Sequence, residues 1–354
     1  MTATSATRRA LAGLAALTLA ATLAGTATGP AEAAAGAFPD KNRIDPASVP
    51  TGPAPTTLHT EGRSIIDGSD TVVTTLPGRL QILGRFGSSY IVHTRHDDDG
   101  TQSLWRVRMD GSALRLRDLD DRTGEEIRLG SYGNRIAYTE ELAGRPFRTR
   151  VFVLRSGDGS VVDSRLLRGH VEVVDFAAKV LLTGIQPKRT VSYLANRDEI
   201  TVRRGLELLS ADIGHKRAVV KVKDLVNGWD GVCLVYAPLS RPRQQLWRSC
   251  TDRPLSFSPD GTRMVTTFIG SDGPGTGKLQ VRVAEANKVL ATLRTGGFFV
   301  QPYWEGNRSF LVHTWNKGKA AILRVSKDGT VERVSPVVSE DVGEDNLQWS
   351  FPPS

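Results

Sequence analysis

The chain contains few of the sequence features from which a particular activity is usually predicted. Among its 354 residues are 2 cysteines and 3 methionines, and aromatic residues account for 6% of the total. Two cysteines with no histidine nearby do not form a zinc site, whose ligands are clustered Cys and His side chains. Lys and Arg (46) outnumber Asp and Glu (38), but five consecutive charges of one sign never occur. This scattering disfavours a nucleic-acid partner, because nucleic-acid-binding proteins concentrate their positive charge.

Sequence motifs of common catalytic sites are also missing. The chain has no Gly-x-Ser-x-Gly, His-Glu-x-x-His or Gly-x-Gly-x-x-Gly pattern and no phosphate-binding Walker loop. These patterns mark hydrolase nucleophiles, zinc proteases, and dinucleotide or nucleotide sites. We therefore predict no catalytic residues, no metal ligands and no cofactor, and we favour a protein that is not an enzyme.

The N-terminus has the composition of an export signal. Arg8 and Arg9 precede an apolar run from Leu11 to Gly25, and small residues follow around Ala31-Glu32-Ala33. This pattern predicts a signal peptide over residues 1–35 and a secreted mature form. A membrane anchor is the alternative, but the apolar run is shorter than the ~20 residues that span a bilayer. We expect no membrane span in the mature protein. The paired arginines leave both Sec and Tat export open.

Residues 36–57 contain five prolines and few apolar side chains. Such a segment buries too little surface to offset the entropy lost on ordering, so we expect a Pro-rich disordered tether. The remaining residues, 58–354, are long enough for one large all-β domain or for two ordinary domains.

A strand-and-turn pattern that recurs about every forty residues predicts one β-propeller domain. The clearest stretch runs from Leu255 to Phe268, where Ser258-Pro259-Asp260-Gly261 separates two strands. Asp-Gly turns recur at Asp110, Asp158 and Asp328, and this dipeptide favours tight hairpins. We place the repeat units at 78–119, 120–167, 168–206, 207–253, 254–295 and 296–337.

The two ends of the domain complement each other. Residues 64–76 have the form of a third and a fourth strand, and residues 346–351 have the form of a first strand. A blade assembled from both termini closes the ring and removes exposed strand edges. We therefore predict four-stranded blades, seven in number, with a closing blade shared by the termini. Six blades with peripheral end strands are the alternative.

The repeat resembles a known family. Phe257-Ser258-Pro259-Asp260-Gly261 followed by an apolar strand is similar to the repeat of TolB-like and WD40-like β-propellers. Tyr303-Trp304-Glu305-Gly306-Asn307 resembles a degenerate copy of it. The Ala-rich leader resembles those of high-GC Gram-positive bacteria, which indicates a secreted actinobacterial type. The resemblance implies the propeller fold and a habit of binding proteins or ligands, without implying a reaction.

The two cysteines are expected to pair. Cys233 and Cys250 flank a hairpin loop at residues 238–243, so both lie on paired strands of one blade. An oxidising compartment and an even cysteine count favour a disulfide. Two buried thiols are the alternative.

Five residues are candidates for binding. His93 and His313 occupy equivalent places in the second strands of the first and last complete units. They become near neighbours if the ring closes between them, which would allow a paired ligand site. We favour the alternative, in which an alternating strand with a polar, hydrogen-bonded residue is simply repeated. Asp97 and Asp99 lie in an acidic loop that could bind calcium but that resembles an ordinary solvated loop. Trp304 is the fifth candidate.

The expected function follows from compartment, fold and charge. The loops between second and third strands meet at one rim, and they are acidic in the first two units and basic in the third and sixth. We expect a monomeric, secreted, non-catalytic propeller that binds a protein or an anionic cell-wall polymer through these loops. A hydrolase or lyase with its site in the central funnel is one alternative. A structural domain without a ligand is another.

Overall fold

In the computed structural model the chain is all-β. The structure describes residues 43–353 except for 97–98, 125, 145, 187, 194–199, 205–206, 224–231, 242–243, 272–274, 287 and 340–348. Within these residues no α-helix is assigned, and no helix is long and apolar enough to cross a membrane. The predicted signal peptide, residues 1–35, lies outside the described residues.

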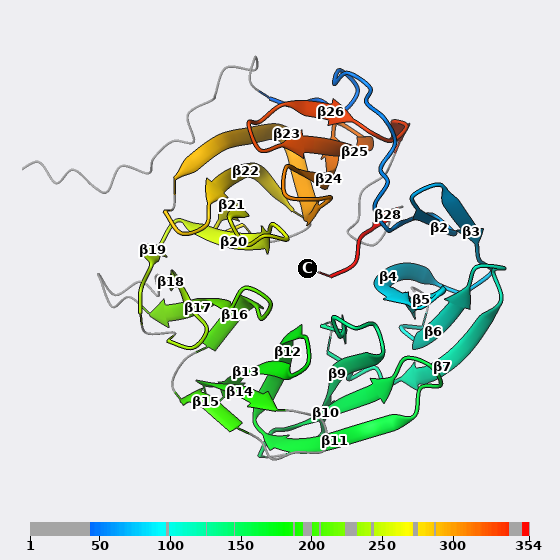
Figure 1. Ribbon diagram of the computed structural model, residues 1–354, viewed down its shortest axis with the longest axis vertical. Coiled ribbons are helices and arrows are strands. Elements are labelled where there is room, and N and C mark those ends of the chain that lie inside the picture. The colour runs from blue at the N-terminus through cyan, green and yellow to red at the C-terminus, as the bar shows by residue number, and fades with distance from the viewer. Residues whose placement is uncertain are drawn as a thin grey trace, which may run out of the picture. The chain divides into compact units, whose positions relative to one another are not determined.

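Antiparallel sheets follow one another around a ring in chain order, with the first strand of each innermost (Figure 1). We call four of them blades 1 to 4, and each has four strands. Blade 1 contains β4 (Arg79–Phe86), β5 (Ser89–Arg95), β6 (Gln102–Arg108) and β7 (Ala113–Leu119), and blade 2 contains β8 (Arg128–Leu129), β9 (Arg135–Leu142), β10 (Arg148–Arg155) and β11 (Val161–Arg168). Blade 3 contains β12 (His170–Phe176), β13 (Val180–Gln186), β14 (Lys188–Tyr193) and β15 (Ile200–Arg204). Blade 4 contains β16 (Glu207–Asp212), β17 (Arg217–Lys223), β18 (Val232–Pro238) and β19 (Trp247–Ser249).

Blades 5 and 6 share one long strand and so form a single eight-stranded sheet. The first part of β23 pairs with β22 as the outer strand of blade 5, and its last part pairs with β24 as the inner strand of blade 6. The strands are β20 (Asp252–Phe257), β21 (Arg263–Phe268), β22 (Thr276–Val283), β23 (Val289–Trp304), β24 (Ser309–Asn316), β25 (Lys319–Ser326), β26 (Val331–Arg333) and β27 (Val338–Ser339).

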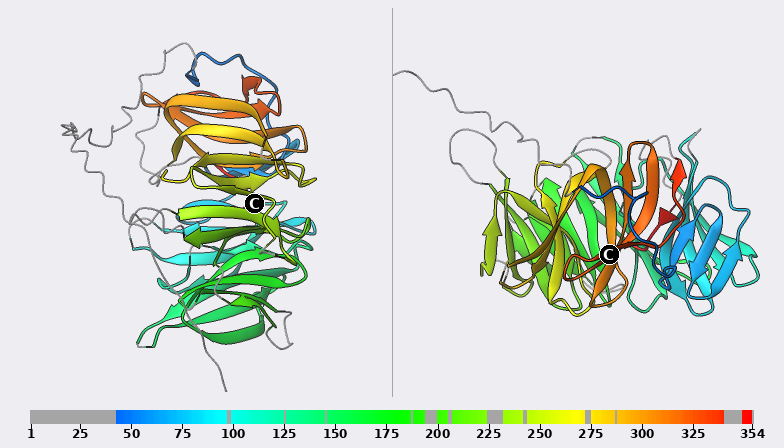
Figure 2. Two further views of the ribbon diagram at one scale, coloured as in Figure 1. Left: turned by 90° about the vertical axis from the view of Figure 1, so that its left-hand side faces the viewer. Right: turned by 90° about the horizontal axis from the view of Figure 1, so that it is seen from above.

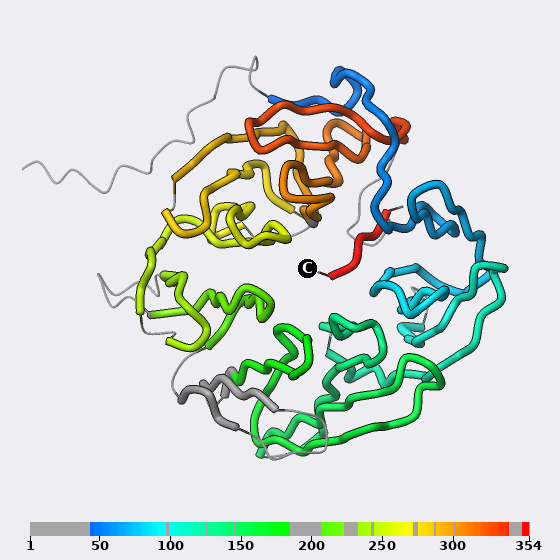
Figure 3. Tube along the Cα trace, in the orientation of Figure 1, coloured from blue at the N-terminus to red at the C-terminus, as the bar shows by residue number. Residues whose placement is uncertain are grey.

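The closing blade contains strands from both ends of the chain. Its order is β28-β1-β2-β3, where β28 is Trp349–Ser350, β1 is His59–Glu61, β2 is Ser64–Asp67 and β3 is Asp70–Val73. Thr60 lies opposite Ser350 and Glu61 lies opposite Trp349. Figure 3 shows the red C-terminal segment beside the blue strands, at the centre of the ring. The prediction of a seventh blade shared by the termini is confirmed.

Hydrophobic clusters fill the spaces between neighbouring blades. The described residues form seven such clusters, one for each contact around a ring of seven blades. The second strands lie between two neighbours and are buried on both faces, as in β5, where five successive residues are buried. Outer strands such as β11 are exposed or half-buried at all but one position. The sheets therefore stand side by side around the ring, as the two views of Figure 2 show.

The hairpin turns follow the Asp-Gly sequences. Gly111, Gly159 and Gly329 have φ values of 81°, 72° and 89°, in the left-handed region that glycine tolerates best. In each turn the aspartate carboxylate accepts a hydrogen bond from the backbone N–H two residues later, as Asp110 does from Ser112 at 2.9 Å. The sequence reasoning about these turns is confirmed.

Residues 43–57 differ from the expected tether, because they pack against the outside of blades 5 and 6. The Ile44 N–H donates to the Arg294 carbonyl at 2.7 Å, and the Gly52 N–H donates to the Arg333 carbonyl at 2.7 Å. Ile44 and Val49 also pack against the hydrophobic cluster of blades 5 and 6. The expectation of disorder is therefore corrected for residues 43–57, since backbone hydrogen bonds order a segment that has few apolar side chains. Residues 36–42 lie outside the described part of the chain.

Candidate ligand-binding cavity

A cavity of about 740 Å³ lies at the centre of the ring. Residues from the beginnings of innermost strands line it, such as Arg79 and Glu207, and so do residues from the ends of second strands, such as Arg95. Because strands in a blade alternate in direction, these positions lie on the face that carries the loops between second and third strands. We call this the loop face. Trp349, Ser350 and Pro353 of the C-terminal segment also line the cavity.

His93 lies in the cavity wall between two glutamines. Its Nδ1 is 3.0 Å from Gln81 Oε1, and its Nε2 is 2.9 Å from Gln102 Oε1. Burial lowers the pKa of His93 to about 4, against a small opposing effect of the Gln102 hydrogen bond. The ring is therefore neutral near pH 7 and has a single N–H to donate. One glutamine must accept that N–H, and the other must turn its NH2 group toward the ring.

Two arginines lie above this histidine, at the mouth of the cavity. Arg79 and Arg95 are directly opposite each other in the β4–β5 pairing, and Arg95 is also opposite Gln102 in the β5–β6 pairing. The Arg95 side chain is exposed, and Arg79 is half-buried. Like charges directly opposite each other in a sheet repel. Arg79 also interacts with another group, and the loop that follows Arg95 contains the exposed Asp99.

Two carboxylates elsewhere in the wall are paired with cations. Glu207 is buried and accepts a hydrogen bond from Lys221 Nζ at 3.1 Å. Glu126 accepts one from the Arg128 guanidinium at 2.7 Å. These pairs balance the charges of Glu126 and Glu207 within their own blades, and Asp121 is a further carboxylate of the wall.

Another ionic contact joins blades 2 and 3 beside the cavity. His170 contacts the cavity-lining Glu172 at 2.8 Å through Nε2 and contacts Glu141 of blade 2 through Nδ1. Burial lowers the pKa of His170, but the Glu172 hydrogen bond and the charges of both glutamates outweigh this and raise it above its ordinary value. The ring thus carries a positive charge over a wider pH range and bridges two carboxylates.

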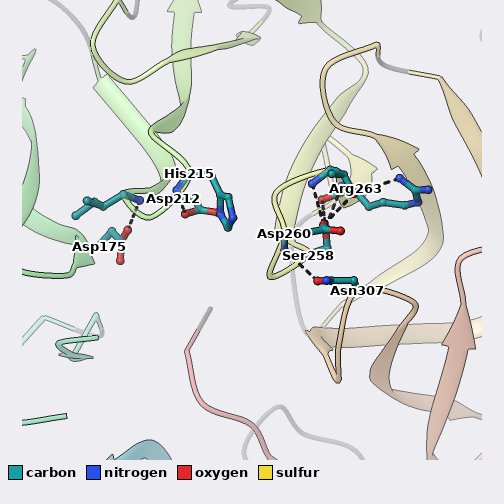
Figure 4. Close-up of polar contacts among 9 residues, drawn as sticks. Asp175, Asp212, His215, Ser258, Asp260, Arg263 and Asn307 are labelled. Atoms are coloured by element: carbon teal, nitrogen blue, oxygen red, sulfur yellow. Dashed lines mark hydrogen bonds and ion pairs between the residues drawn. The ribbon is translucent and has the colours of Figure 1, made fainter. Parts of the chain in front are cut away.

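The opposite face of the ring is built differently. There the turns between first and second strands contact one another from blade to blade (Figure 4). Asp175 of blade 3 accepts a hydrogen bond from the Ile213 N–H of blade 4 at 2.8 Å. The Asp260 N–H of blade 5 donates to Asn307 Oδ1 of blade 6 at 3.0 Å. The Ser258-Pro259-Asp260-Gly261 motif thus joins neighbouring blades, which is a structural role.

The two candidate histidines lie in different environments. His93 lines the cavity, whereas His313 is buried with its ring 5.1 Å from that of Trp349. The closing blade stands between their two blades. The hydrogen-bonded partners of His93 are amides rather than carboxylates. The structure therefore brings one of the two histidines to the cavity.

The remaining candidates are placed as follows. Asp97 lies outside the described residues, and Asp99 Oδ1 accepts hydrogen bonds from the Thr101 N–H and hydroxyl at 2.9 and 2.7 Å. Trp304 is buried in the cluster between blades 5 and 6. Within the described ranges, His, Cys, Asp and Glu residues form no group of three or more that could hold a metal ion.

The cysteine prediction is confirmed. Cys233 and Cys250 form a disulfide, and their Cα atoms are 4.0 Å apart. Cys233 belongs to β18, and Cys250 directly follows β19, with which β18 pairs. The bridge therefore ties the outer strand of blade 4 to its neighbour.

The sequence reasoning did not identify the polar residues of the cavity wall, namely Arg79, Gln81, Arg95, Gln102, Glu172 and Glu207. They lie in strands where polar residues are expected to face solvent. Their position within the repeat was an available signal, because the beginning of every innermost strand faces the ring axis in a propeller.

Comparison with known proteins supports the fold. No protein-family model matches the chain, and no curated protein matches it in sequence. A chain from the structure of the mitotic checkpoint complex matches with a TM-score of 0.52 and 11% identity, over 85% of this chain and 89% of that one. The WD40 β-propeller domain of Doa1 matches with a TM-score of 0.49 and 11% identity, over 82% and 88%. TolB from Acinetobacter baumannii matches with 0.45 and 12%, over 84% and 66%.

These identities are too low to indicate a shared function. The TM-scores of the matches to Doa1 and TolB, which are below 0.5, do not establish a shared fold by themselves. Fold does not determine function. Sheet order, blade contacts and the match to the chain of the mitotic checkpoint complex together define the protein as a β-propeller with seven blades and a polar central cavity.

Proposed function

We propose that this chain is a secreted, non-catalytic β-propeller of the TolB-like and WD40-like kind, with a signal peptide over residues 1–35 and an actinobacterial leader. It binds an anionic cell-wall polymer through its loop face. The observation that supports this most is that the mouth of the central cavity lies on the face where the second strands end and the third strands begin. Lys317 and Lys319 of blade 6 are exposed there.

The charge of the whole chain agrees with an anionic partner. The formal net charge is +8, and an exported basic protein meets the anionic polymers of the cell wall. Long-range attraction by such a charge raises the rate of association and weakens with salt. An acidic protein is the alternative partner for the same face.

The environment of the cavity histidine supports binding more than catalysis. A general base needs a pKa near the working pH and a free nitrogen. Burial keeps the pKa of His93 at about 4, and both ring nitrogens contact glutamine amides. Both ring nitrogens of His170 contact carboxylates, which raise its pKa, so neither nitrogen is free to accept a proton from a substrate.

Sedimentation with isolated cell walls tests the proposal. The mature protein should sediment with actinobacterial cell walls, and Lys319→Glu should reduce the bound fraction. Lys327→Glu is a matched control, because Lys319 begins β25 and Lys327 follows the other end of the same strand. Both lysines are exposed. Equal losses for the two variants would indicate non-specific attraction, and a wild-type protein that stays in solution would contradict the proposal.

A further inference from the structure

The cavity wall beside blade 1 contains charges of both signs. Arg79, Arg95 and Asp121 line the cavity there, and the exposed Asp99 lies in the loop that follows Arg95. Arg79 also interacts with another group. Two cations and two carboxylates near one another offset much of each other's field. We therefore expect the uncharged groups of this wall, rather than its charges, to decide which ligand it binds.

Three uncharged side chains of this wall form one hydrogen-bonded unit. His93 contacts Gln81 through Nδ1 and Gln102 through Nε2, and all three residues line the cavity. Neither glutamine side chain has another partner among the described residues. A neutral imidazole has one N–H donor and one acceptor nitrogen, and burial keeps His93 neutral near pH 7 by lowering its pKa to about 4. One glutamine therefore accepts from the ring through its oxygen, and the other donates to it through its NH2 group.

The tautomer of His93 fixes what the two amides offer to a ligand. The glutamine that accepts from the ring keeps its NH2 group for the cavity, and the glutamine that donates to the ring keeps its oxygen. If the imidazole proton moves to the other nitrogen and both amides turn over, the two roles exchange. In either tautomer the unit therefore offers one amide donor and one amide acceptor, on opposite sides of the ring.

The C-terminal segment adds a hydroxyl group next to this unit. Ser350 lines the cavity, and its Oγ accepts a hydrogen bond from the Ile82 N–H at 3.2 Å. Ile82 directly follows Gln81 in β4. The hydroxyl keeps its own proton to donate, because no described residue accepts it. Convergent amides and hydroxyls of this kind fix the orientation of ligands in cavities that are otherwise apolar.

Apolar residues from blades 4 and 5 line another part of the cavity. Leu209 belongs to the innermost strand β16 and lines the cavity, yet it is 45% exposed. Pro254 and Leu255 of β20 also line the cavity. The cavity therefore combines a hydrogen-bonding wall with an apolar one, which suits a ligand that has both polar groups and C–H faces, as sugars have.

We propose that the cavity binds an N-acetylated sugar unit of a wall polymer, whose acetamido group lies between Gln81 and Gln102. A secondary amide donates through its N–H on one side and accepts through its carbonyl on the other, as the glutamine pair requires. A hydroxyl has both functions on one oxygen, whose partners lie within about 3 Å of it, so it is a poorer match for amides on opposite sides of an imidazole. The cavity volume of about 740 Å³ lies within the range of ligand sites, roughly 300–1,000 Å³. This inference rests on the proposed function for the source of the ligand.

Calorimetric titration with two matched sugars tests this site. Triacetylchitotriose and cellotriose share one backbone and linkage, but each ring of the first carries an acetamido group where the second carries a hydroxyl. We expect wild-type protein to bind triacetylchitotriose, and to bind cellotriose at least about tenfold more weakly because two hydrogen bonds to the glutamines are lost. Equal affinity for the two sugars, or binding of neither, would refute the assignment. If the peptide N-acetyl-alanyl-alanine amide binds more tightly than triacetylchitotriose, the cavity takes peptides and the sugar assignment is wrong.

Two glutamine variants test which residues bind the acetamido group. Gln102→Met should lower the affinity for triacetylchitotriose on the order of tenfold. Gln280→Met is the matched control, because Gln280 is also a half-buried glutamine in a strand but contacts Arg282 of blade 5 and does not line the cavity. This control should bind within about twofold of wild type, since distant sites act independently. Equal losses in the two variants would contradict the site.

A second measurement covers the case in which Gln102→Met lowers the melting temperature. The ring nitrogens of His93 are followed in wild-type protein by nitrogen NMR and are assigned by their absence in His93→Gln. Triacetylchitotriose should shift these signals, because the bound amide favours one tautomer. The signals of His215, which contacts Asp212 on the opposite face (Figure 4), should stay unchanged. Unchanged His93 signals at saturation would contradict the proposal.

The outcomes separate this site from the proposed function. If wild-type protein sediments with cell walls but does not distinguish the two sugars, the site is wrong and the proposed function stands. If triacetylchitotriose binds through Gln102 but cell walls do not bind, the site stands and the proposed function fails.

Discussion

Replacing Phe351 by alanine should weaken the closure of the ring. The Phe351 side chain is 1% exposed and belongs to the cluster between blade 6 and the closing blade. Its ring stacks on Tyr303 with centroids 5.5 Å apart and lies 6.1 Å from His59. Truncation of a buried phenylalanine costs about 3–5 kcal/mol, from lost burial and from the cavity left behind.

This cost is large relative to the total free energy of unfolding of a domain. Domains are usually stable by only about 5–15 kcal/mol, so Phe351→Ala should remove roughly a fifth or more of the free energy of unfolding. The expected fall in melting temperature is at least about 5 °C. Thermal unfolding followed by circular dichroism, with urea unfolding as a second measure, would quantify both.

Phe147→Ala is the control for this prediction. The Phe147 side chain is 56% exposed, and the backbone carbonyl that accepts the Gly169 N–H stays in place after the substitution. A surface substitution of this kind should change stability by about 0.5 kcal/mol or less. If Phe351→Ala melts like Phe147→Ala, the C-terminal segment does not close the ring in the way described.

Three further predictions concern other parts of the molecule. Arg324 contacts Glu305 and Glu332 and donates to the Pro53 carbonyl at 3.0 Å. Arg324→Met should lower the free energy of unfolding in urea by about 3 kcal/mol, because it leaves the Glu305 carboxylate without its cation. An unchanged urea midpoint would contradict the docking of residues 43–57. Removing the Cys233–Cys250 disulfide by a double serine substitution should cost about 3 kcal/mol by loop entropy, and two reactive thiols in the unreduced, unfolded wild-type protein would show that the bond is not formed. Burial lowers the pKa of His93 from 6.5 to about 4, so folding favours the neutral ring. This contributes up to about 3 kcal/mol to stability above pH 6.5, and the contribution is lost as the pH falls from 6.5 to 4. The His93→Gln variant should therefore lose less stability than wild type over that pH interval, and parallel curves of melting temperature against pH would refute this.

The repeats were predictable because local sequence dictates them. An Asp-Gly turn requires a positive φ at the glycine, and Gly111 and Gly159 have one. Alternation of apolar residues then fixes which side of each strand packs against a neighbour. The predicted unit boundaries agree with the strands for the same reason, as in the unit 78–119, which contains β4 to β7.

The docking of residues 43–57 could not be predicted in this way. Its contacts combine backbone hydrogen bonds, such as those of Ile44 and Gly52, with hydrogen bonds from distant side chains, and neither kind leaves a local sequence pattern. Proline content indicates only that the segment is neither a helix nor a central strand. The decisive partner, Arg324, is 271 residues from Pro53 in the sequence.

The cavity wall was unpredictable for a related reason. Arg79 and Arg95 are alternating polar residues of ordinary appearance, and only the pairing register places them opposite each other at the ring axis. Register and ring geometry are long-range properties, whereas sequence patterns report local ones. The histidine candidates show the same limit, since equivalent strand positions put His93 in the cavity and His313 against Trp349.

Hydrogen–deuterium exchange on the complex with isolated wall polymer tests the central claim, that the loop face binds the partner. The account predicts slower exchange at the beginning of β4, at the end of β5 and in the β24–β25 loop around Lys317. Exchange should be unchanged at the Asp110-Gly111 and Asp328-Gly329 turns, which lie on the opposite face. Protection of those turns, with none around the cavity mouth, would contradict the account.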